Sequence, residues 1–242
     1  MTQLILHHHD PSPFAEKIRL VFGIKGLAWN SVQIPMIMPK PDLTALTGGY
    51  RKTPVVQIGA DIYCDSALIA RELERRFPEP SLFPNGSSGL AFALGRWSDK
   101  AFFKPGAGLS MGENKQIPEE VLDDRKNFFN FMDFDRMAES MPHAYAQFQA
   151  NCQLLEDELA CRSGDYLLGE SAAWIDILAY FPVWMARSNI PRATELLQPF
   201  EEINRWSQAM EQVGHGQRTE LASTDALDIA RNAEPEDGAA VE

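Results

Sequence analysis

A run of proline, glycine and serine divides this chain into two halves that differ in their periodicity. The stretch FPEPSLFPNGSSG contains Pro78, Pro80 and Pro84, and neither a helix nor a strand extends far through such a sequence. Before it, short β-prone runs alternate with amphipathic helical patterns, whereas only helical periodicity follows it. The sequence therefore predicts two domains and a linker: residues 1–80, residues 88–217 and the linker 81–87.

The first half has the pattern of a mixed α/β domain. Residues 3–6 form a short apolar run, and residues 13–22 carry apolar side chains at spacings of three and four. A second strand is expected near residues 29–34, followed by a proline-rich segment that is expected to be an irregular loop. Two apolar runs on either side of residues 59–61 predict a β-hairpin, and residues 67–77 predict a helix. The predicted order is βαβ followed by ββα.

The second half predicts an all-α helical bundle, with helical periodicity that continues to about residue 213. From Arg218 onward the chain has seven acidic residues against two basic ones and almost no aromatic side chains. Residues 218–242 are therefore predicted to be a mobile acidic tail. Two other interpretations stay open: the apolar side chains of TDALDIARN dock as a final turn of helix, or the tail is the remnant of a longer protein.

Charge and cysteine content argue against several classes of function. The formal net charge of −12 argues against nucleic acids and anionic membrane surfaces as partners. Cys64, Cys152 and Cys161 lack the spacing of zinc ligands or of a CxxC motif. No apolar run approaches the roughly 18 residues of a membrane span. We expect a cytoplasmic protein without a metal site.

Three consecutive histidines fall in the predicted loop between the first strand and the first helix. Alternation at a strand end places only His7 and His9 on one side, and no carboxylate or thiol follows at ligand spacing. Metal binding is therefore not expected, and His7, His8 and His9 are interpreted as lining a site or contacting solvent.

Two segments resemble the glutathione transferases. The first is SPF after a strand and before a helix, and the second is KTPVVQIGADIYCDSALIARELERRF, residues 52–77. Together they cover about the first 80 residues, and their order and separation make the match specific. The resemblance implies a thioredoxin-like N-terminal domain followed by an all-helical domain. It also implies a cytoplasmic homodimer that binds glutathione as co-substrate, and a hydrophobic electrophilic small molecule, as in detoxification.

Ser12 is the residue that the resemblance places on the glutathione sulfur. At a helix N-terminus, free backbone N–H groups and the helix dipole favour an anion such as a thiolate. Making a thiol with a pKa of about 8.5 two units more acidic requires about 2.7 kcal/mol, which a hydroxyl donor and a helix N-terminus together can supply. No GxSxG elbow surrounds Ser12, so it fits a hydrogen-bond donor rather than a nucleophile. A plain N-cap also explains it.

The remaining site residues also follow from the resemblance. It implies a cis peptide at Thr53–Pro54, which leaves the Thr53 backbone free to pair with the cysteinyl part of glutathione like an added strand. Asp65 and Ser66 match an acidic-Ser motif that holds the γ-glutamyl ammonium and carboxylate. Lys52 is a candidate for the glycyl carboxylate. A trans proline, a plain helix cap and a solvated lysine are the alternatives without a ligand.

In the second half, YLLGESAAWIDILAYF resembles the family's helix-capping motif, although Ala173 stands where Ser or Thr is expected. Asp176 therefore lacks its usual capping-box partner, unless Ser171 starts the helix earlier. The co-substrate pocket is expected between the domains, lined by the helix that contains Trp97, Phe102 and Phe103 and by the loop GAGLSMGEN, residues 106–114.

The leading hypothesis is transfer of the glutathione sulfur to an electrophilic carbon. A glutathione-dependent isomerase, dehalogenase or ether-cleaving enzyme would use the same thiolate on another electrophile. A disulfide reductase of this fold normally needs Cys in place of Ser12. The alternative from a different class is a non-catalytic binding protein that keeps the fold.

Overall fold

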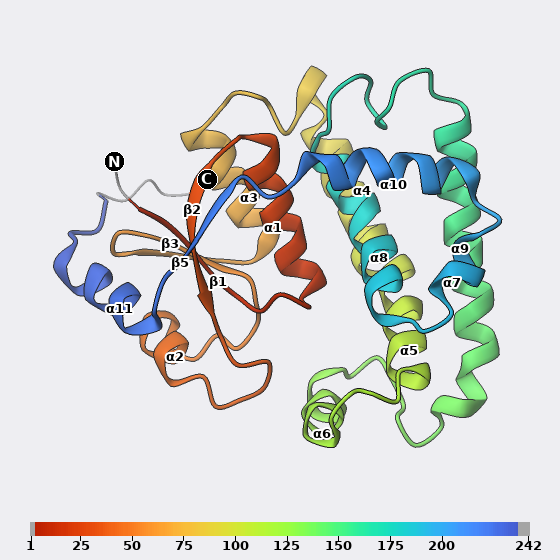
Figure 1. Ribbon diagram of the computed structural model, residues 1–242, viewed down its shortest axis with the longest axis horizontal. Helices are drawn as coiled ribbons and strands as arrows, with labels where there is room; N and C mark the ends of the chain where they lie inside the picture. Colours follow the sequence, from red (N-terminus) through yellow and green to blue (C-terminus); the bar gives the residue numbers. More distant parts are fainter. Residues whose placement is uncertain (1–2, 237–242) are drawn as a thin grey trace. The chain divides into compact units, whose positions relative to one another are not determined.

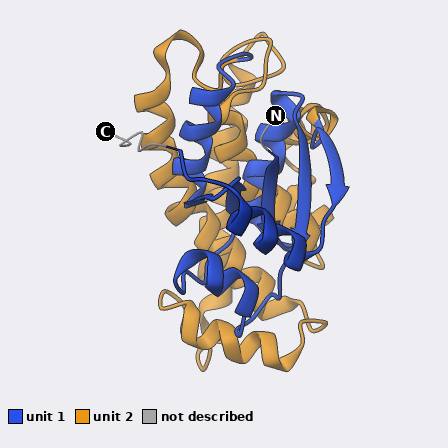
Figure 2. Cartoon of the chain, turned by 90° about the vertical axis from the view of Figure 1, so that its left-hand side faces the viewer, with its two compact units in different colours: residues 1–80, 214–242 blue, residues 81–213 orange. Residues whose placement is uncertain are grey.

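The computed structural model describes residues 3–236 and consists of two compact units. Unit 1 combines the chain up to Pro80 with the chain from Gly214 onward, and unit 2 spans Ser81–Val213 (Figure 2). The break near residue 80 agrees with the predicted linker. The return of the C-terminal segment to unit 1 differs from the predicted division.

Unit 1 is built on one mixed five-stranded sheet with the strand order β4-β3-β1-β2-β5 (Figure 1). β1 pairs in parallel with β2 and antiparallel with β3, which continues antiparallel into β4. β5 joins the outer side of β2 in parallel. The strands are β1 Leu4–His8, β2 Ala28–Gln33, β3 Val55–Ile58, β4 Asp61–Cys64 and β5 Gln217–Glu220. The predicted βαβ and ββα order is confirmed, with a helix added between them.

Two pairs of helices cover the two faces of this sheet (Figure 1). α1 (Pro13–Ile24) and α3 (Ser66–Arg76) pack against each other on one face. α2 (Pro41–Thr47) and α11 (Ser223–Asn232) pack against each other on the other. There the apolar core contains side chains from the sheet and from both helices: Ile5, Val32, Ile34, Leu43, Val55 and Ala226.

The helix α2 lies in the segment that the sequence predicted to be an irregular loop. It has only seven residues, too few for a clear apolar periodicity. Pro41 occupies its first turn, and Gly48 ends it with a φ of 67°, a left-handed conformation that glycine adopts at little cost.

Residues 218–236 differ from the predicted mobile tail. They contribute β5, and then α11, which corresponds to the alternative interpretation of TDALDIARN. All four β5 side chains are exposed, so backbone hydrogen bonds to β2 hold this strand and leave no apolar pattern in the sequence. Gly216 allows the close approach, because a Cβ there would lie 2.3 Å from the Leu27 carbonyl oxygen. Residues 237–242 lie outside the described residues.

Unit 2 is helical, as predicted, apart from one isolated bridge between Tyr166 and Gly169. Buried aromatic rings from different helices meet in its core: Phe102 and Phe148 lie 5.1 Å apart between centroids, and Tyr180 and Trp206 lie 5.6 Å apart. The main helices are α4 Ser88–Trp97, α5 Phe103–Glu113, α6 Glu119–Phe128, α7 Met137–Ala160, α8 Trp174–Asn189, α9 Ala193–Leu197 and α10 Glu201–Val213, with a π-helical turn at Ser98–Phe102 joining α4 to α5.

The segment GAGLSMGEN is helical and not the predicted loop, since all but its last residue belong to α5. Its glycines allow close packing rather than a turn. A Cβ at Gly106 would lie 2.7 Å from Met185 and 3.0 Å from Phe148, and one at Gly112 would lie 2.5 Å from Met141. Tertiary packing thus overrides the low helix propensity of glycine here.

Within residues 3–236, none of the helices combines the length and the apolar character needed to cross a lipid bilayer.

Candidate functional site

The topology of the sheet brings three of the predicted segments to one edge. His7 of β1 is paired with Val55 of β3, and Val55 is paired with Cys64 of β4. The residues that leave β1, enter β3 and leave β4 therefore emerge at the same end of these strands. The Thr53 hydroxyl lies 3.3 Å from the His7 carbonyl oxygen and donates to it. This strand-end cluster consists of Ser12, Lys52, Thr53, Pro54, Asp65 and Ser66.

Ser12 caps the N-terminus of α1. Its backbone is extended (φ −74°, ψ 117°), and its Oγ accepts a hydrogen bond from the Ala15 N–H at 3.2 Å. Pro13 follows at the first helical position, where a missing N–H costs nothing. Because Oγ acts here as an acceptor, the hydroxyl proton can still be donated to another group. The side chain is 3% exposed.

The Thr53–Pro54 peptide is cis, in agreement with the prediction. Pro54 is buried, Thr53 is partly buried and Lys52 is exposed. β3 begins directly after this bond, at Val55.

Asp65 caps the N-terminus of α3 with its carboxylate, which is also the group predicted from the sequence to bind a ligand. One oxygen accepts from the Ala67 N–H at 2.9 Å and from the Leu68 N–H at 3.3 Å. The φ of Asp65 is 78°, a strained value for a residue with a Cβ. Ser66 is 9% exposed, while Asp65 is exposed. Burial, and then the negative charge of Asp65, raise the pKa of Tyr50 to about 12, so its phenol stays neutral.

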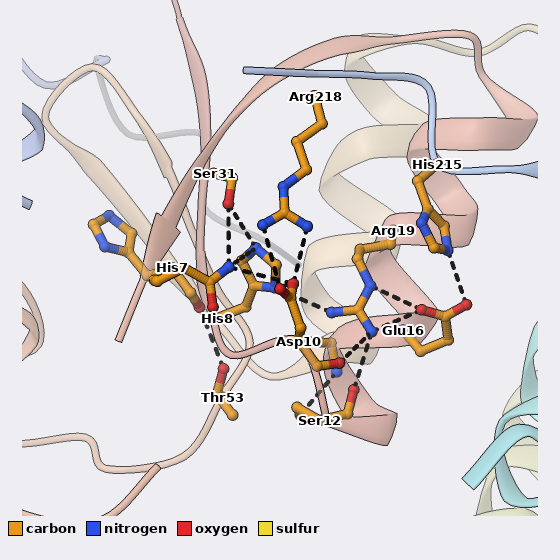
Figure 3. A network of polar contacts seen from close by, with 12 residues as sticks. His7, His8, Asp10, Ser12, Glu16, Arg19, Ser31, Thr53, His215 and Arg218 are labelled. Atoms are coloured by element: carbon orange, nitrogen blue, oxygen red, sulfur yellow. Dashed lines mark hydrogen bonds and ion pairs between the residues drawn. The ribbon is translucent and has the colours of Figure 1, made fainter. Parts of the chain in front are cut away.

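Next to Ser12 lies a buried polar network that the sequence analysis did not predict (Figure 3). Arg19 of α1 pairs with Glu16 one turn earlier at 2.7 Å, and each side chain is 3% exposed. The guanidinium also contacts His8 Nδ1 at 3.0 Å and donates to the carbonyl oxygens of Asp10 at 3.0 Å and Ser12 at 3.5 Å. In the sequence, Glu16 and Arg19 have the i,i+3 spacing of an ordinary solvated helix pair, which gave no signal of burial.

His8 is held neutral inside this network. Because a guanidinium only donates, His8 Nδ1 accepts from it and the ring proton lies on Nε2, which bonds Ser31 Oγ at 3.1 Å. Burial, together with the positive charge of Arg19, lowers the pKa of His8 to about 3.

The network also includes side chains of the C-terminal segment (Figure 3). His215 Nε2 lies 2.9 Å from Glu16 Oε1, and Arg218 lies 2.9 Å from an Asp10 carboxylate oxygen. Burial alone would raise the pKa of Glu16, but the hydrogen bond from His215 and the charge of Arg19 outweigh it and hold that pKa below its usual value. Glu16 is therefore ionised at neutral pH.

The three histidines do not converge. His7 and His8 belong to β1, which extends two residues beyond the predicted strand, so their side chains point to opposite faces of the sheet. The His7 Nε2 lies 2.9 Å from Gln57 Oε1, and Gln57 donates in turn to the Ala226 carbonyl of α11 at 2.8 Å. Both histidines are buried structural groups, and among residues 3–236 no cluster of His, Cys, Asp or Glu could hold a metal ion.

In unit 2, the helix expected to line the co-substrate pocket carries two core aromatics and one that is partly buried, Trp97. Phe102 is fully buried and Phe103 is 6% exposed, while the Trp97 indole donates to Asn151 at 2.7 Å. A surface groove of about 610 Å³ lies along the same segment of this unit, and its lining includes Lys100, Lys104, Gly108, Phe131, Arg136 and His143.

Asp176 makes half of the capping box that the sequence motif suggested. Its carboxylate accepts from the Ala173 N–H at 3.0 Å, and alanine offers no side-chain oxygen in return. The Leu167 N–H and the Trp206 indole donate to the same carboxylate at 2.8 and 3.1 Å. Burial outweighs these three hydrogen bonds and raises the pKa of Asp176 to about 6.

Comparison with known proteins relates both units to one superfamily. Residues 6–81 match the family described as the glutathione S-transferase N-terminal domain. A GST-like protein from Pseudomonas syringae has a crystal structure that is similar over 100% of this chain and 78% of its own, with 37% identity and a TM-score of 0.78.

More distant relatives agree. A probable glutathione transferase from Aplysia californica is 35% identical over 72 residues, which are 29% of this chain and 76% of that protein. The theta class glutathione S-transferase of Xanthomonas axonopodis pv. citri, solved with glutathione bound, shares the fold at a TM-score of 0.63 and 19% identity, over 89% of this chain and 98% of its own.

Proposed function

This chain belongs to the glutathione S-transferase superfamily, and on that basis we propose that it is a glutathione-dependent transferase in which Ser12 activates the glutathione thiol. The observation that carries the proposal is the strand-end cluster, because Ser12, the cis Thr53–Pro54 bond and the Asp65–Ser66 cap lie at one end of neighbouring strands. A tripeptide with a thiol, two carboxylates and an ammonium group requires this combination of donors and acceptors.

Each part of glutathione has a proposed partner in this cluster. The Thr53 backbone pairs with the cysteinyl residue, and the start of α3 at Ser66 binds the γ-glutamyl carboxylate. The exposed Asp65 carboxylate binds the ammonium group with the lone pairs that its two N–H contacts leave unused. Lys52 binds the glycyl carboxylate.

The chemical role of Ser12 is donation of a hydrogen bond to the thiolate. Its Oγ already accepts from the Ala15 N–H, so the hydroxyl is oriented at the helix N-terminus with its proton available. A hydrogen bond to a charged acceptor contributes about 1.5–3 kcal/mol, which corresponds to about one to two units of thiol pKa. The enzyme thereby supplies a preformed thiolate close to a hydrophobic electrophile.

The superfamily also supports proposals about location, assembly and role. We propose that the protein is cytoplasmic, that it is a homodimer and that it detoxifies electrophilic small molecules. The dimer is tested by light scattering after size exclusion, where a mass near 27 kDa would contradict it and a mass twice as large would agree.

The central test compares Ser12→Ala with Ser12→Thr. Glutathione is titrated into each protein, and the ultraviolet absorbance of the bound thiolate is followed against pH. We expect Ser12→Ala to raise the pKa of the bound thiol by about one to two units, and to slow turnover of an aryl halide accordingly. Ser12→Thr retains the hydroxyl and restores both. An unchanged thiol pKa in Ser12→Ala would refute the proposed role of this hydroxyl.

The same assay separates the alternatives. One outcome is that the protein binds glutathione and does not turn over aryl halides, but has isomerase, dehalogenase or ether-cleaving activity. The role of the thiolate is then correct, and the electrophile is of another class. No binding at millimolar glutathione indicates a non-catalytic member of the superfamily.

A further inference from the structure

The loop that carries Ser12 depends on a side chain for its shape. Residues 9–12 connect β1 to α1 and make one backbone hydrogen bond of their own, from the Ser12 N–H to the His9 carbonyl at 3.0 Å. The carbonyl oxygens of Asp10 and Ser12, on either side of Pro11, accept from the Arg19 guanidinium. The Ser12 carbonyl also accepts from the Glu16 N–H at 3.0 Å within α1, so Arg19 chiefly fixes the Asp10 end of this segment to the helix.

Arg19 is itself held by Glu16, and Glu16 is held by the C-terminal segment. The Glu16 carboxylate binds Arg19 through Oε2 and His215 through Oε1, so the two contacts do not compete. His215 is fixed by its backbone, because its carbonyl accepts from the Trp29 indole at 2.6 Å and the next residues pair with Leu27 and β2. A chain of direct contacts thus runs from the C-terminal segment to the Ser12 carbonyl.

A second contact reaches the same loop from the other side (Figure 3). Arg218 of β5 pairs with the Asp10 carboxylate, and its guanidinium lies 5.8 Å from the centre of the Trp29 ring. The Asp10 side chain is 59% exposed, so this pair contributes little to global stability. Its location matters more than its strength, because Asp10 is two residues from Ser12.

We infer that residues 214–220 are part of the glutathione-binding machinery, with His215 and Arg218 as positioning residues that hold the Ser12 loop in its binding conformation. The inference rests on the proposed function of Ser12. It assigns a role in ligand binding to a segment that follows the whole helical unit in the sequence. In this proposal His215 acts through Glu16 and Arg19, and Arg218 acts through Asp10.

The experiment uses the full chain with three variants. His215→Leu removes the donor to Glu16, His215→Gln keeps an N–H donor, and Arg218→Gln removes the charge opposite Asp10. The matched control is Arg231→Gln, which removes an arginine of the same C-terminal segment whose i,i+3 partner is Asp228 and not the loop. Backbone hydrogen exchange at Ser12 and Ala15, glutathione affinity and the thermal midpoint are measured for each.

We expect His215→Leu and Arg218→Gln each to speed exchange at Ser12 and Ala15 and to weaken glutathione binding by about twofold to fivefold, the range that one partly exposed ion pair provides. His215→Gln should restore both, and Arg231→Gln should match the wild type. If His215→Leu does not fold, Asp10→Asn tests the loop contact from its other side.

The outcomes separate the two proposals. Failure of the wild-type protein to bind glutathione refutes the proposed function. Binding by the wild type with unchanged affinity in His215→Leu, Arg218→Gln and Asp10→Asn refutes only the positioning role. Faster exchange without weaker binding also refutes that role, because the loop would then move without consequence for the ligand.

Discussion

Next to the first turn of α1, unit 1 buries a guanidinium, a carboxylate and an imidazole in contact with one another, whereas the interior of unit 2 packs aromatic rings and buries the carboxylate of Asp176, which one indole contacts. In unit 1 the buried charges bind the backbone of a loop. In unit 2 the buried carboxylate binds the start of a helix and one indole. The difference lies in the charges: unit 1 fixes the irregular segment beside its proposed site with a buried ion pair, whereas unit 2 fixes the segment before α8 with a single buried carboxylate that also binds Leu167.

The largest expected effect tests the charged interior of unit 1. Arg19→Met keeps most of the side-chain volume but removes the guanidinium. Glu16 then retains only its contact with His215, and the Asp10 carbonyl loses its hydrogen bond from Arg19. Breaking such a buried pair costs about 3–5 kcal/mol. We expect that loss in the free energy of unfolding from urea titration, with the fastest increase in hydrogen exchange in β1. A loss below about 1 kcal/mol would contradict the view that this pair organises unit 1.

The next effect concerns pH and unit 2. The pKa of Asp176 is raised to about 6, above the value of about 3.9 in the unfolded chain. The native state therefore prefers the protonated carboxyl. The contribution of this protonated group to the free energy of unfolding is fully present below about pH 4 and is lost as the pH rises through 6, a change of about 3 kcal/mol. The unfolding free energy of Asp176→Asn, compared with that of the wild type between pH 4 and pH 7, isolates this titration. A constant difference between the two proteins would disprove it.

The smallest effect has the opposite sign and lies in unit 1. The pKa of His8 is lowered to about 3, below the unfolded value of about 6.5. The stability provided by neutral His8 is fully present above about pH 6.5 and declines as the pH falls, by about 2 kcal/mol at pH 5. His8→Gln removes this dependence. Hydrogen exchange measured in β1 and in α8 from pH 7 to pH 5 should therefore show unit 1 losing stability relative to unit 2, and parallel changes would remove the contrast.

Local signals in the sequence were sufficient for several features of the site. Ser12 and Pro13 mark a helix start within two residues. The hairpin and the cap at Asp65 could be predicted because their signals also lie within a few adjacent residues. The cis bond at Thr53–Pro54 was predicted only through the family resemblance, since most bonds before proline are trans. The roles of Lys52, Thr53, Asp65 and Ser66 toward glutathione stay predictions.

Features without a local signal were missed. α2 is too short to show a period, and β5 is held by its backbone with all its side chains exposed. Glu16 and Arg19 look like a surface pair, because burial of their charges requires partners that lie far away in the sequence: His215 is 199 residues from Glu16, and Arg218 is 208 residues from Asp10.

Local patterns were enough to predict the α/β half, the helical half and the helix start at Ser12, because periodicity and capping act over a few residues. The return of the chain after Val213 to the first unit depends on tertiary contacts, through which β5 completes the sheet and His215 and Arg218 meet the Ser12 network. Backbone pairing at a sheet edge and the burial of a charge both require partners that lie close in space and far away in the sequence. The residues next to β5 and to Glu16 in the sequence therefore do not predict these contacts.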